Sequence, residues 1–165
     1  MFENVILTLT FLSALGCGLI GGVFFAFSTF VMKALKRLPA ATGIAAMQSI
    51  DIVAVSPMFM TALFGTGFGC LALVVLSLVR WHQPGASWVV AGGSLYLIGA
   101  VLVTIIFNVP LNNELAAVDS GSAAGAEVWA RYVPGWTAWN TVRTVTSLAA
   151  SACFMVGLCL KVQAR

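Results

Sequence analysis

Long stretches without a single charged residue constrain this chain more than any other feature. No Asp, Glu, Lys or Arg occurs in Val5–Met32, Ile52–Val79 or Ser87–Leu111. Each stretch exceeds the ~18 consecutive apolar residues that mark a membrane-spanning helix. The whole chain is only 8% charged, whereas a soluble domain has about a quarter of its residues charged. The sequence therefore predicts an integral membrane protein.

Four apolar runs define the predicted spans. They are Asn4–Leu35, Val53–Arg80, Ser87–Val109 and Trp139–Leu160. At ~20 residues per crossing, the chain suits an all-α four-helix bundle that forms a single domain over residues 1–165. Between the first two runs, Ile44, Met47 and Ile50 recur at helical spacing. This spacing predicts a short interfacial helix before the second span.

The connections between the runs set the predicted topology. The short turn Trp81–Gly85 makes the second and third helices antiparallel neighbours. From Asn112 we expect a flexible connection of about 24 residues. Basic residues slightly favour the face of the first and third connections, which the positive-inside rule assigns to the cytoplasm. No basic residue precedes Val5, which favours a retained first span over a cleaved signal peptide. We expect a protein of a bacterial inner membrane.

Several function classes lack the residues that they need. The single histidine, His82, excludes bis-histidine haem ligation within one chain. The four cysteines lie inside predicted spans without metal-ligand spacing, and we interpret them as small buried apolar residues. No phosphate loop and no basic stripe with interleaved aromatic residues occurs, so nucleic acid is not an expected partner. We predict no metal and no cofactor; the expected partners are membrane lipid and a small molecule, and a homo-oligomer stays open.

Polar and aromatic residues gather on one membrane face, where the third run ends and the fourth begins. They are Asn108, Asn112, Trp136, Trp139, Asn140 and Arg143. Trp136, Asn140 and Arg143 are spaced i, i+4 and i+7, so they share one helix face. Pro110 predicts a kink or break between the two asparagines. Because polar groups in hydrocarbon are costly, this cluster is the candidate site.

Arg143 in particular needs a partner or a route to water at this depth, and Asp51 and Glu114 are the candidates. We expect Phe24 and Ser28 of the first helix to border the same pocket. The opposing interpretation is structural: interfacial tryptophans anchor helices, an arginine reaches the interface, and asparagines bond across helices. A non-catalytic membrane subunit or a small-solute carrier would then be the alternative function.

Three segments carry a more specific pattern. They are Gly21–Leu35, Asn108–Leu115 and Trp129–Thr144, the last reading W-x-x-Y-x-x-x-W-x-x-W-N-x-x-R-T. From Gly21 to Ser147 the chain resembles the anthrone oxygenase-like family of small four-helix membrane proteins. The resemblance implies the same fold. Some members, mainly fungal, are linked to the oxidation of anthrones to anthraquinones without an obvious metal or flavin.

These observations lead to a functional hypothesis. We expect a cofactor-independent oxygenase, or a binding protein, for an aromatic, anthrone-like small molecule. Its catalytic candidates are Arg143, Asn140, Asn108 and Asp51, and its substrate-binding candidates are Asn112, Trp136, Trp139, Phe24 and Ser28. The asparagines would donate hydrogen bonds to the substrate, Arg143 would stabilise an enolate, and Asp51 or Glu114 would act as the base. On this view Asn140→Ala weakens binding and leaves the fold intact.

Overall fold

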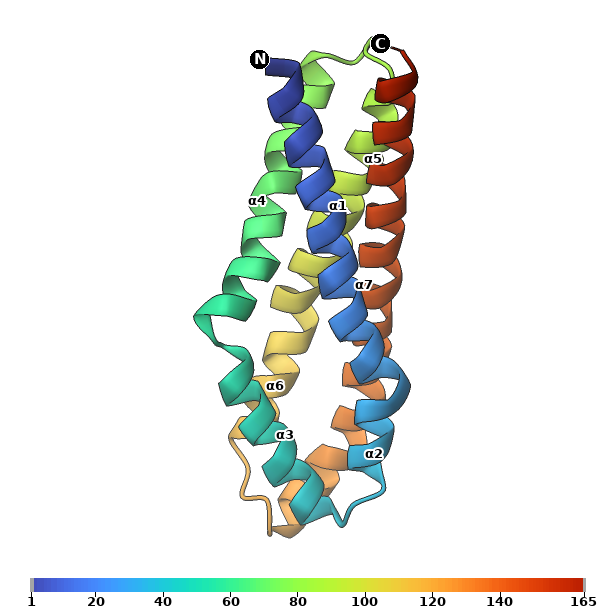
Figure 1. Ribbon diagram of the computed structural model, residues 1–165. Coiled ribbons are helices and arrows are strands. Elements are labelled where there is room, and N and C mark those ends of the chain that lie inside the picture. Colours follow the sequence, from blue (N-terminus) through green and yellow to red (C-terminus); the bar gives the residue numbers. More distant parts are fainter. Residues whose placement is uncertain (1, 165) are drawn as a thin grey trace.

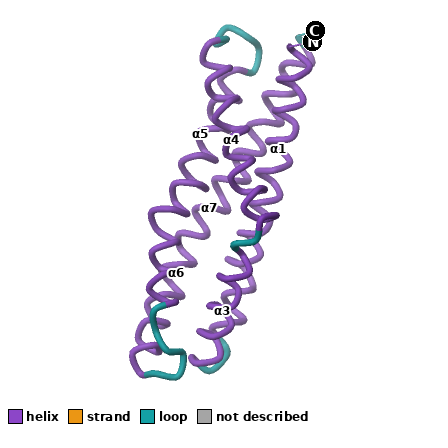
Figure 2. The backbone as a smooth tube through the Cα atoms, turned by 90° about the vertical axis from the view of Figure 1, so that its left-hand side faces the viewer, coloured by secondary structure: helices purple, strands orange, loops and turns teal. Residues whose placement is uncertain are grey.

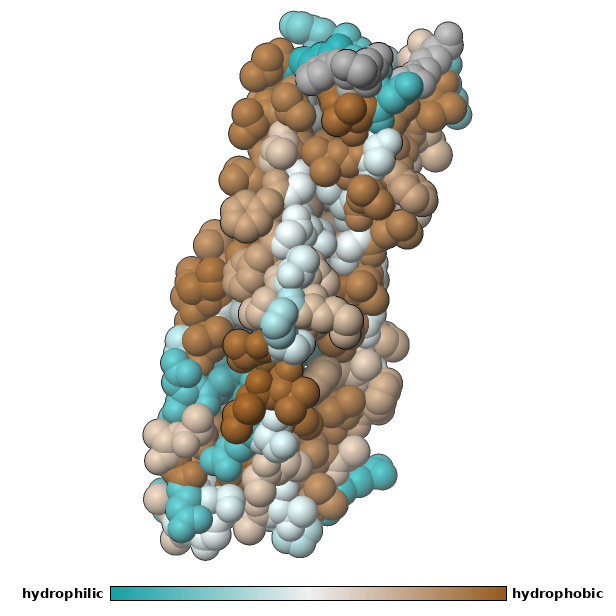
Figure 3. Space-filling view, turned by 60° about the vertical axis from the view of Figure 1, so that its left-hand side comes forward, coloured by the Kyte–Doolittle hydropathy of each residue, from teal (hydrophilic) through white to brown (hydrophobic). Residues whose placement is uncertain are grey.

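The computed structural model describes residues 2–164, which form a bundle of long helical rods (Figure 1). Four rods within these residues are long and apolar enough to cross a membrane: Glu3–Lys36, Pro57–Val79, Ala86–Ala116 and Ala123–Gln163. Apolar side chains cover most of the visible length in Figure 3, and hydrophilic atoms gather towards the two ends. The predicted all-α membrane bundle is therefore confirmed.

Two of the rods change helix type along their length. The first consists of α1 (Phe2–Ala26), a π-helical segment η1 (Phe27–Val31) and α2 (Met32–Lys36). The third consists of α5 (Ala86–Tyr96), two π-helical segments η2 (Leu97–Leu102) and η3 (Thr104–Asn108), and α6 (Val109–Ala116). The second and fourth rods are α4 (Pro57–Val79) and α7 (Ala123–Gln163).

The predicted short helix exists as α3 (Ala40–Ala54). After a break, α4 continues from it in a similar direction (Figure 1). The break lies at Val55 and Ser56 and is visible as a loop between two helices in Figure 2. Ser56 caps α4 by accepting a hydrogen bond from the Phe59 amide at 3.4 Å, and Pro57 suits the first turn because it needs no N–H partner there. The break brings the end of α3 against the middle of the bundle.

The predicted antiparallel arrangement of the rods is also confirmed. The described ends of α1 and α7 lie at the same end of the bundle, beside the short turn between α4 and α5 (Figure 1). The opposite end holds α3 and the turn between α6 and α7. At the short turn, Gly85 has φ +77°, and a Cβ there would lie 2.5 Å from the carbonyl oxygen of Gly157. Glycine at this position thus lets the turn contact α7 directly.

Two boundaries differ from the prediction. The helix α7 begins at Ala123 instead of near Trp139, so the expected long connection is only the turn at residues 117–122. Ser122 starts the helix, since its Oγ accepts from the Gly125 amide at 2.9 Å. Of the predicted kink or break at Pro110, the break does not occur, because this proline falls in the first turn of α6 and the rod continues through it from Ala86 to Ala116.

The interior divides into two apolar cores, one towards each end of the bundle. The first core joins α1, α4, α5 and α7 and includes Phe24 and Leu63. The second joins α2, α3, α6 and α7 and includes Met47 and Trp136. A layer of polar side chains lies along α7 near their junction, and it includes Asn140 and Arg143, both buried. This layer coincides with the candidate site.

Candidate functional site

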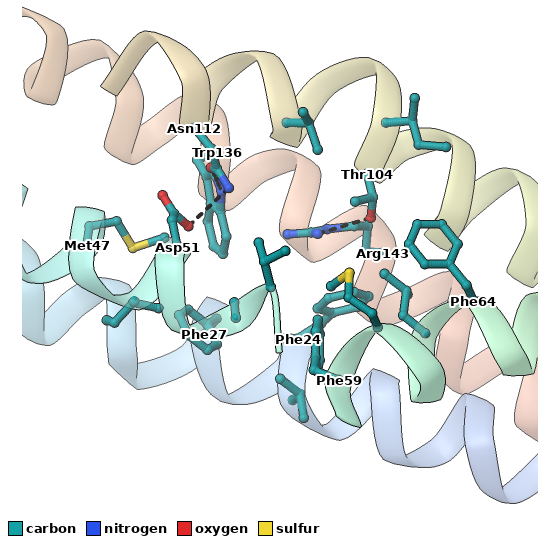
Figure 4. Close-up of a pocket in the computed structure, with 18 residues that line it drawn as sticks. Phe24, Phe27, Met47, Asp51, Phe59, Phe64, Thr104, Asn112, Trp136 and Arg143 are labelled. Carbon is teal, nitrogen blue, oxygen red and sulfur yellow. Dashed lines mark hydrogen bonds between the residues drawn. The ribbon is translucent and has the colours of Figure 1, made fainter. Parts of the chain in front are cut away.

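An apolar cavity of about 210 Å³ lies where the two cores meet, because Phe24, Leu63, Met47 and Trp136 all line it. All four membrane-spanning rods and α3 contribute to its walls (Figure 4). Further apolar lining residues are Val23, Phe27, Ile50, Ala54, Val55, Phe59, Met60, Phe64, Ile105 and Val109. An apolar cavity of about 150 Å³ holds benzene, so this one has room for an aromatic ring.

Two residues of the cavity wall, on α4 and on the third rod, also belong to the outer surface of the bundle. Phe64 of α4 and Ile105 of η3 both line it, and both are exposed at the surface, by 37% and 49% respectively. These residues lie within the apolar, membrane-spanning rods. Only part of the wall thus separates the cavity from the side that faces the acyl chains.

One polar group of the cavity is Arg143, which is only 5% exposed. Its Nη1 donates to Thr104 Oγ1 at 3.1 Å, and its Nη2 donates to Asn140 Oδ1 at 2.7 Å. Its Cζ lies 4.2 Å from the ring centroid of Phe24 and 5.2 Å from that of Trp136. Two aromatic faces and two neutral oxygens thus hold the cation in place.

The predicted ion pair of Arg143 is not formed. Glu114 pairs instead with Arg131, whose Nη2 lies 2.7 Å from Oε1. Asp51 lines the same cavity as Arg143 but accepts from Asn112, and Arg143 has no ion pair among the residues that the structure describes. The prediction that Arg143 faces the interior is confirmed. A hydroxyl oxygen, an amide oxygen and two aromatic rings surround this cation, whereas the sequence alone suggested a carboxylate partner.

The second polar group of the cavity is Asp51, held by an asparagine of α6. Asn112 Nδ2 donates to Asp51 Oδ1 at 3.0 Å. Asn112 Oδ1 accepts from the Tyr132 hydroxyl at 3.0 Å and from Trp136 Nε1 at 2.8 Å. Because two donors from α7 occupy its oxygen, the amide nitrogen of Asn112 must point towards Asp51. The carboxylate orientation is thus fixed by a relay that starts on α7.

The electrostatic environment of Asp51 favours a proton acceptor that works near neutral pH. Burial raises the pKa of this carboxyl to about 6, and the positive charge of Arg143 opposes the rise. At pH 7 the side chain is therefore mostly ionised and yet more basic than an ordinary aspartate. Figure 4 shows Asp51 with Asn112 on one side of the cavity and Arg143 with Thr104 on the other.

Asn140 links α7 to the first rod from behind the cavity. Its Nδ2 donates to the Phe24 carbonyl and to Ser28 Oγ, both at 2.7 Å, while its Oδ1 accepts from Arg143. Ser28 lies in η1, and Phe24 lies just before it. π-Helical turns often occur at functional sites, and here one lies beside a backbone carbonyl that accepts a hydrogen bond from an asparagine of the neighbouring helix.

The structure brings most of the predicted site residues together but gives them different surroundings. Phe24, Asp51, Asn112, Trp136 and Arg143 line the cavity. Ser28, Asn108 and Asn140 lie behind its wall; Asn108, for example, donates to the Trp136 carbonyl at 3.3 Å. Trp139 does not reach the cavity: it stacks on Phe107 with ring centroids 3.6 Å apart. Its predicted place in the pocket is wrong because it projects from another side of α7 than Trp136.

Other lining residues carry little or no signal in the sequence. Thr104 could have been found, because it lies one helical turn before Asn108 inside an apolar run. Phe59 and Phe64 have no polar residues at helical spacing that would mark a site, so the sequence does not distinguish them from lipid-facing phenylalanines. Among residues 2–164, no group of three His, Cys, Asp or Glu side chains lies close enough to hold a metal ion.

Comparisons with known proteins place the chain at the level of its family. Neither the curated proteins nor the solved structures include a match. A family model described as anthrone oxygenase matches residues 55–153. The matched segment is more than half of the 165-residue chain and contains Thr104, Asn112, Trp136 and Arg143, whereas Asp51 precedes it. The motifs around Asn108 and Trp136 and the four-helix membrane fold agree with this match, and the chain belongs to the anthrone oxygenase family.

Proposed function

We propose that this protein is a membrane-embedded, cofactor-independent oxygenase that acts on a flat, hydroxylated aromatic ketone of the anthrone type. One observation carries the proposal. The Asp51 carboxylate, whose pKa is raised by burial, and the buried cation Arg143 line the same apolar cavity without forming an ion pair with each other. Membership of the anthrone oxygenase family supports the same substrate class.

The shape and polarity of the cavity suit such a substrate. Its aromatic walls, among them Phe24, Phe59 and Trp136, can contact the faces and edges of fused rings. The Nε–H of Arg143 is buried and has no hydrogen-bond partner among the described residues. Nη1 and Nη2 donate to Thr104 and Asn140 and each has a second N–H, which would donate to a ketone oxygen bound in the cavity. The rings would come from the bilayer, between Phe64 and Ile105.

The two charged groups of the cavity, Asp51 and Arg143, would divide the chemistry. In an anthrone the ketone carbon and the methylene carbon are opposite each other in the central ring. With the ketone oxygen at Arg143, the methylene carbon points away from the cation and towards the Asp51 side. Asp51 would remove a proton from this carbon, and Arg143 would stabilise the negative charge that develops on the oxygen.

Dioxygen would then complete the reaction. The deprotonated carbon reduces O₂ and forms a C–O bond, and the peroxide takes up a proton to become a hydroperoxide. Loss of the second hydrogen of that carbon with cleavage of the O–O bond leaves a new ketone and one water molecule. The substrate methylene group is oxidised by four electrons, and one O₂ is reduced to the ketone oxygen and water.

The asparagines have positioning roles in this scheme. Asn140 holds the guanidinium of Arg143, and Asn112 holds the carboxylate of Asp51. Both amide groups are already engaged with other protein groups, so direct hydrogen bonds to the substrate are not needed. This assignment replaces the expectation that the asparagines bind the substrate oxygens themselves.

The test is oxidation of anthrone by the purified full chain in lipid nanodiscs. Anthraquinone absorbance and incorporation of ¹⁸O from ¹⁸O₂ into the new ketone would be followed, with protein-free nanodiscs as the background. Asp51→Asn and Arg143→Met should each lower the catalysed rate by about 100-fold or more. The matched controls Glu127→Gln and Arg131→Met each remove a charge of the same sign at an exposed position outside the cavity and should retain it. Full activity of Asp51→Asn, or no oxidation above background by the parent chain, would contradict the proposal.

A further inference from the structure

A second cavity adjoins the first at Asp51 and Asn112. It has a volume of about 620 Å³. The residues that line both cavities are Asp51, Asn112, Val55 and Val109. Its remaining walls include polar side chains, namely Gln48, Asn113, Asp119 and Ser120. We call this second cavity the polar vestibule. Asp51 and Asn112 therefore stand between an apolar cavity and a polar one.

The vestibule lies at the end of the bundle where α3, α6 and the turn at residues 117–122 meet. Asn113, Ala116 and Asp119 line it and are exposed. This end of the bundle also bears the exposed ion pair of Arg131 and Glu114, and Figure 3 shows hydrophilic atoms gathered towards it. Its position and its polar walls make it accessible to water.

One wall of the vestibule is held in place by a defined contact. Gln48 Nε2 donates to the carbonyl oxygens of Leu115 and Val118, at 2.9 and 3.0 Å. These bonds tie α3 to the end of α6 and to the turn that follows it. Because both N–H groups of Gln48 are used in this way, the residue supports the wall and is not available as a donor to a bound solute.

We infer that the site has two separate openings: an apolar one for the ring system and the polar vestibule, through which water and protons reach Asp51. The inference rests on the proposed function, because that reaction releases one water molecule for each ketone formed. Few groups in the apolar cavity can form hydrogen bonds with water. The vestibule has polar walls and meets the apolar cavity at the Asp51 carboxylate.

The groups around Asp51 fit this arrangement. From α7 it faces the positive charge of Arg143 across the cavity, and Tyr132 approaches it through Asn112. From the turn at residues 117–122, Asp119 lines the vestibule with it. The first rod contributes only apolar residues to the cavity, including Phe24 and Phe27. Aqueous protons thus approach a carboxylate through a partly acidic passage, and the cation lies on the apolar side.

The test measures access to position 51 and needs no enzymatic activity. Asp51→Cys in the full chain, reconstituted in nanodiscs, is labelled with a charged, water-soluble methanethiosulfonate and separately with an uncharged, apolar maleimide. The parent chain gives the background from its four native cysteines. Ala116→Trp is added to fill the vestibule, and Ala117→Trp is the matched control, because Ala117 is exposed beside it and does not line the vestibule.

The charged reagent should label Asp51→Cys, and Ala116→Trp should slow that labelling by about tenfold or more, since thiol reaction rates depend on access. Ala117→Trp should leave the rate of labelling by the charged reagent unchanged. The apolar maleimide should label Asp51→Cys at the same rate with Ala116→Trp and with Ala117→Trp. Asn113→Trp, which also projects into the vestibule, is the second plug if Ala116→Trp does not fold. No labelling by the charged reagent, or equal rates with and without the plugs, would overturn the inference.

Failure of this inference and failure of the proposed function give different results. Plug-sensitive labelling together with a fully active Asp51→Asn would retain the vestibule and reject the catalytic role of Asp51. Loss of oxidation in Asp51→Asn together with labelling that ignores both plugs would retain the base and reject the aqueous opening.

Discussion

Replacing Asn140 by leucine should weaken the whole bundle and not only the candidate site. The substitution nearly conserves volume but removes three hydrogen bonds, to the Phe24 carbonyl, to Ser28 Oγ and from Arg143 Nη2. Asn140 is fully buried, so water cannot replace these partners. The structure thus changes the expectation from sequence, in which truncation of Asn140 leaves the fold intact.

The expected loss of stability follows from the number of these bonds. Hydrogen bonds between membrane helices contribute ~0.6 kcal/mol on average and up to ~1.7 kcal/mol each. Three such bonds therefore give a loss of about 2–5 kcal/mol. The upper part of this range applies if the guanidinium of Arg143 finds no new acceptor, because an unsatisfied charged donor costs more than a neutral one.

The assay is reversible unfolding in mixed micelles by increasing the mole fraction of dodecyl sulfate, followed by tryptophan fluorescence. Asn113→Leu is the matched control, since it makes the same change at an exposed position and should stay within about 0.5 kcal/mol of the parent chain. An Asn140→Leu protein that unfolds at the same dodecyl sulfate fraction as Asn113→Leu would refute the linking role of Asn140.

Three further predictions concern single positions. Because burial raises the pKa of Asp51 from 3.8 to about 6, the folded state binds more protons than the unfolded state between these values, so stability falls as the pH rises. Asp51→Asn should therefore stabilise the protein at pH 7.5 and lose this advantage towards pH 4; an equal effect at both pH values in unfolding titrations would contradict it. Gly85→Ala should lower thermal stability by at least about 1–2 kcal/mol because of its positive φ. Gly22→Ala is the control and should not lower stability, because its added Cβ meets nothing within 4 Å. Similar melting temperatures of the Gly85→Ala and Gly22→Ala proteins would count against the close turn. Trp136→Ala should weaken the affinity for anthrone, measured by fluorescence, by about tenfold, and Trp139→Ala should not change it. A larger loss of affinity in Trp139→Ala than in Trp136→Ala would show that anthrone binds elsewhere.

The fold could be predicted because the bilayer places strict demands on a sequence. A spanning helix must be apolar over its whole length, so uncharged runs locate the spans, and the spacing of Ile44, Met47 and Ile50 locates α3. The start of α7 could not be found in this way. Residues 123–138 are too polar to resemble a span, and they form a helix because Trp129, Tyr132 and Trp136 pack in the second core.

The site could be predicted only where burial of a polar group is costly. That argument identifies Asn140 and Arg143 and their inward orientation. It does not identify Phe59 or the other apolar lining residues, because cavity walls and lipid-facing surfaces have the same composition. It also assigns Arg143 a carboxylate partner, because charges are visible in a sequence, whereas the bonds to Thr104 and Asn140 require known helix positions.

The π-helical segments η1, η2 and η3 have a consequence for how this family can tolerate insertions and deletions. A π turn holds about one residue more than an α turn, and each residue of a helix rotates the following part by about 100°. Removing one residue from Thr104–Asn108 could restore an ordinary α-helix and preserve a spanning rod. Because the restored α turn closes with one residue fewer, the same deletion should leave Asn112 facing Asp51. Single-residue deletions in these segments should therefore be tolerated. A single-residue deletion in a purely α-helical part of a rod rotates the following part by about 100°, so it should preserve membrane insertion and disrupt the site.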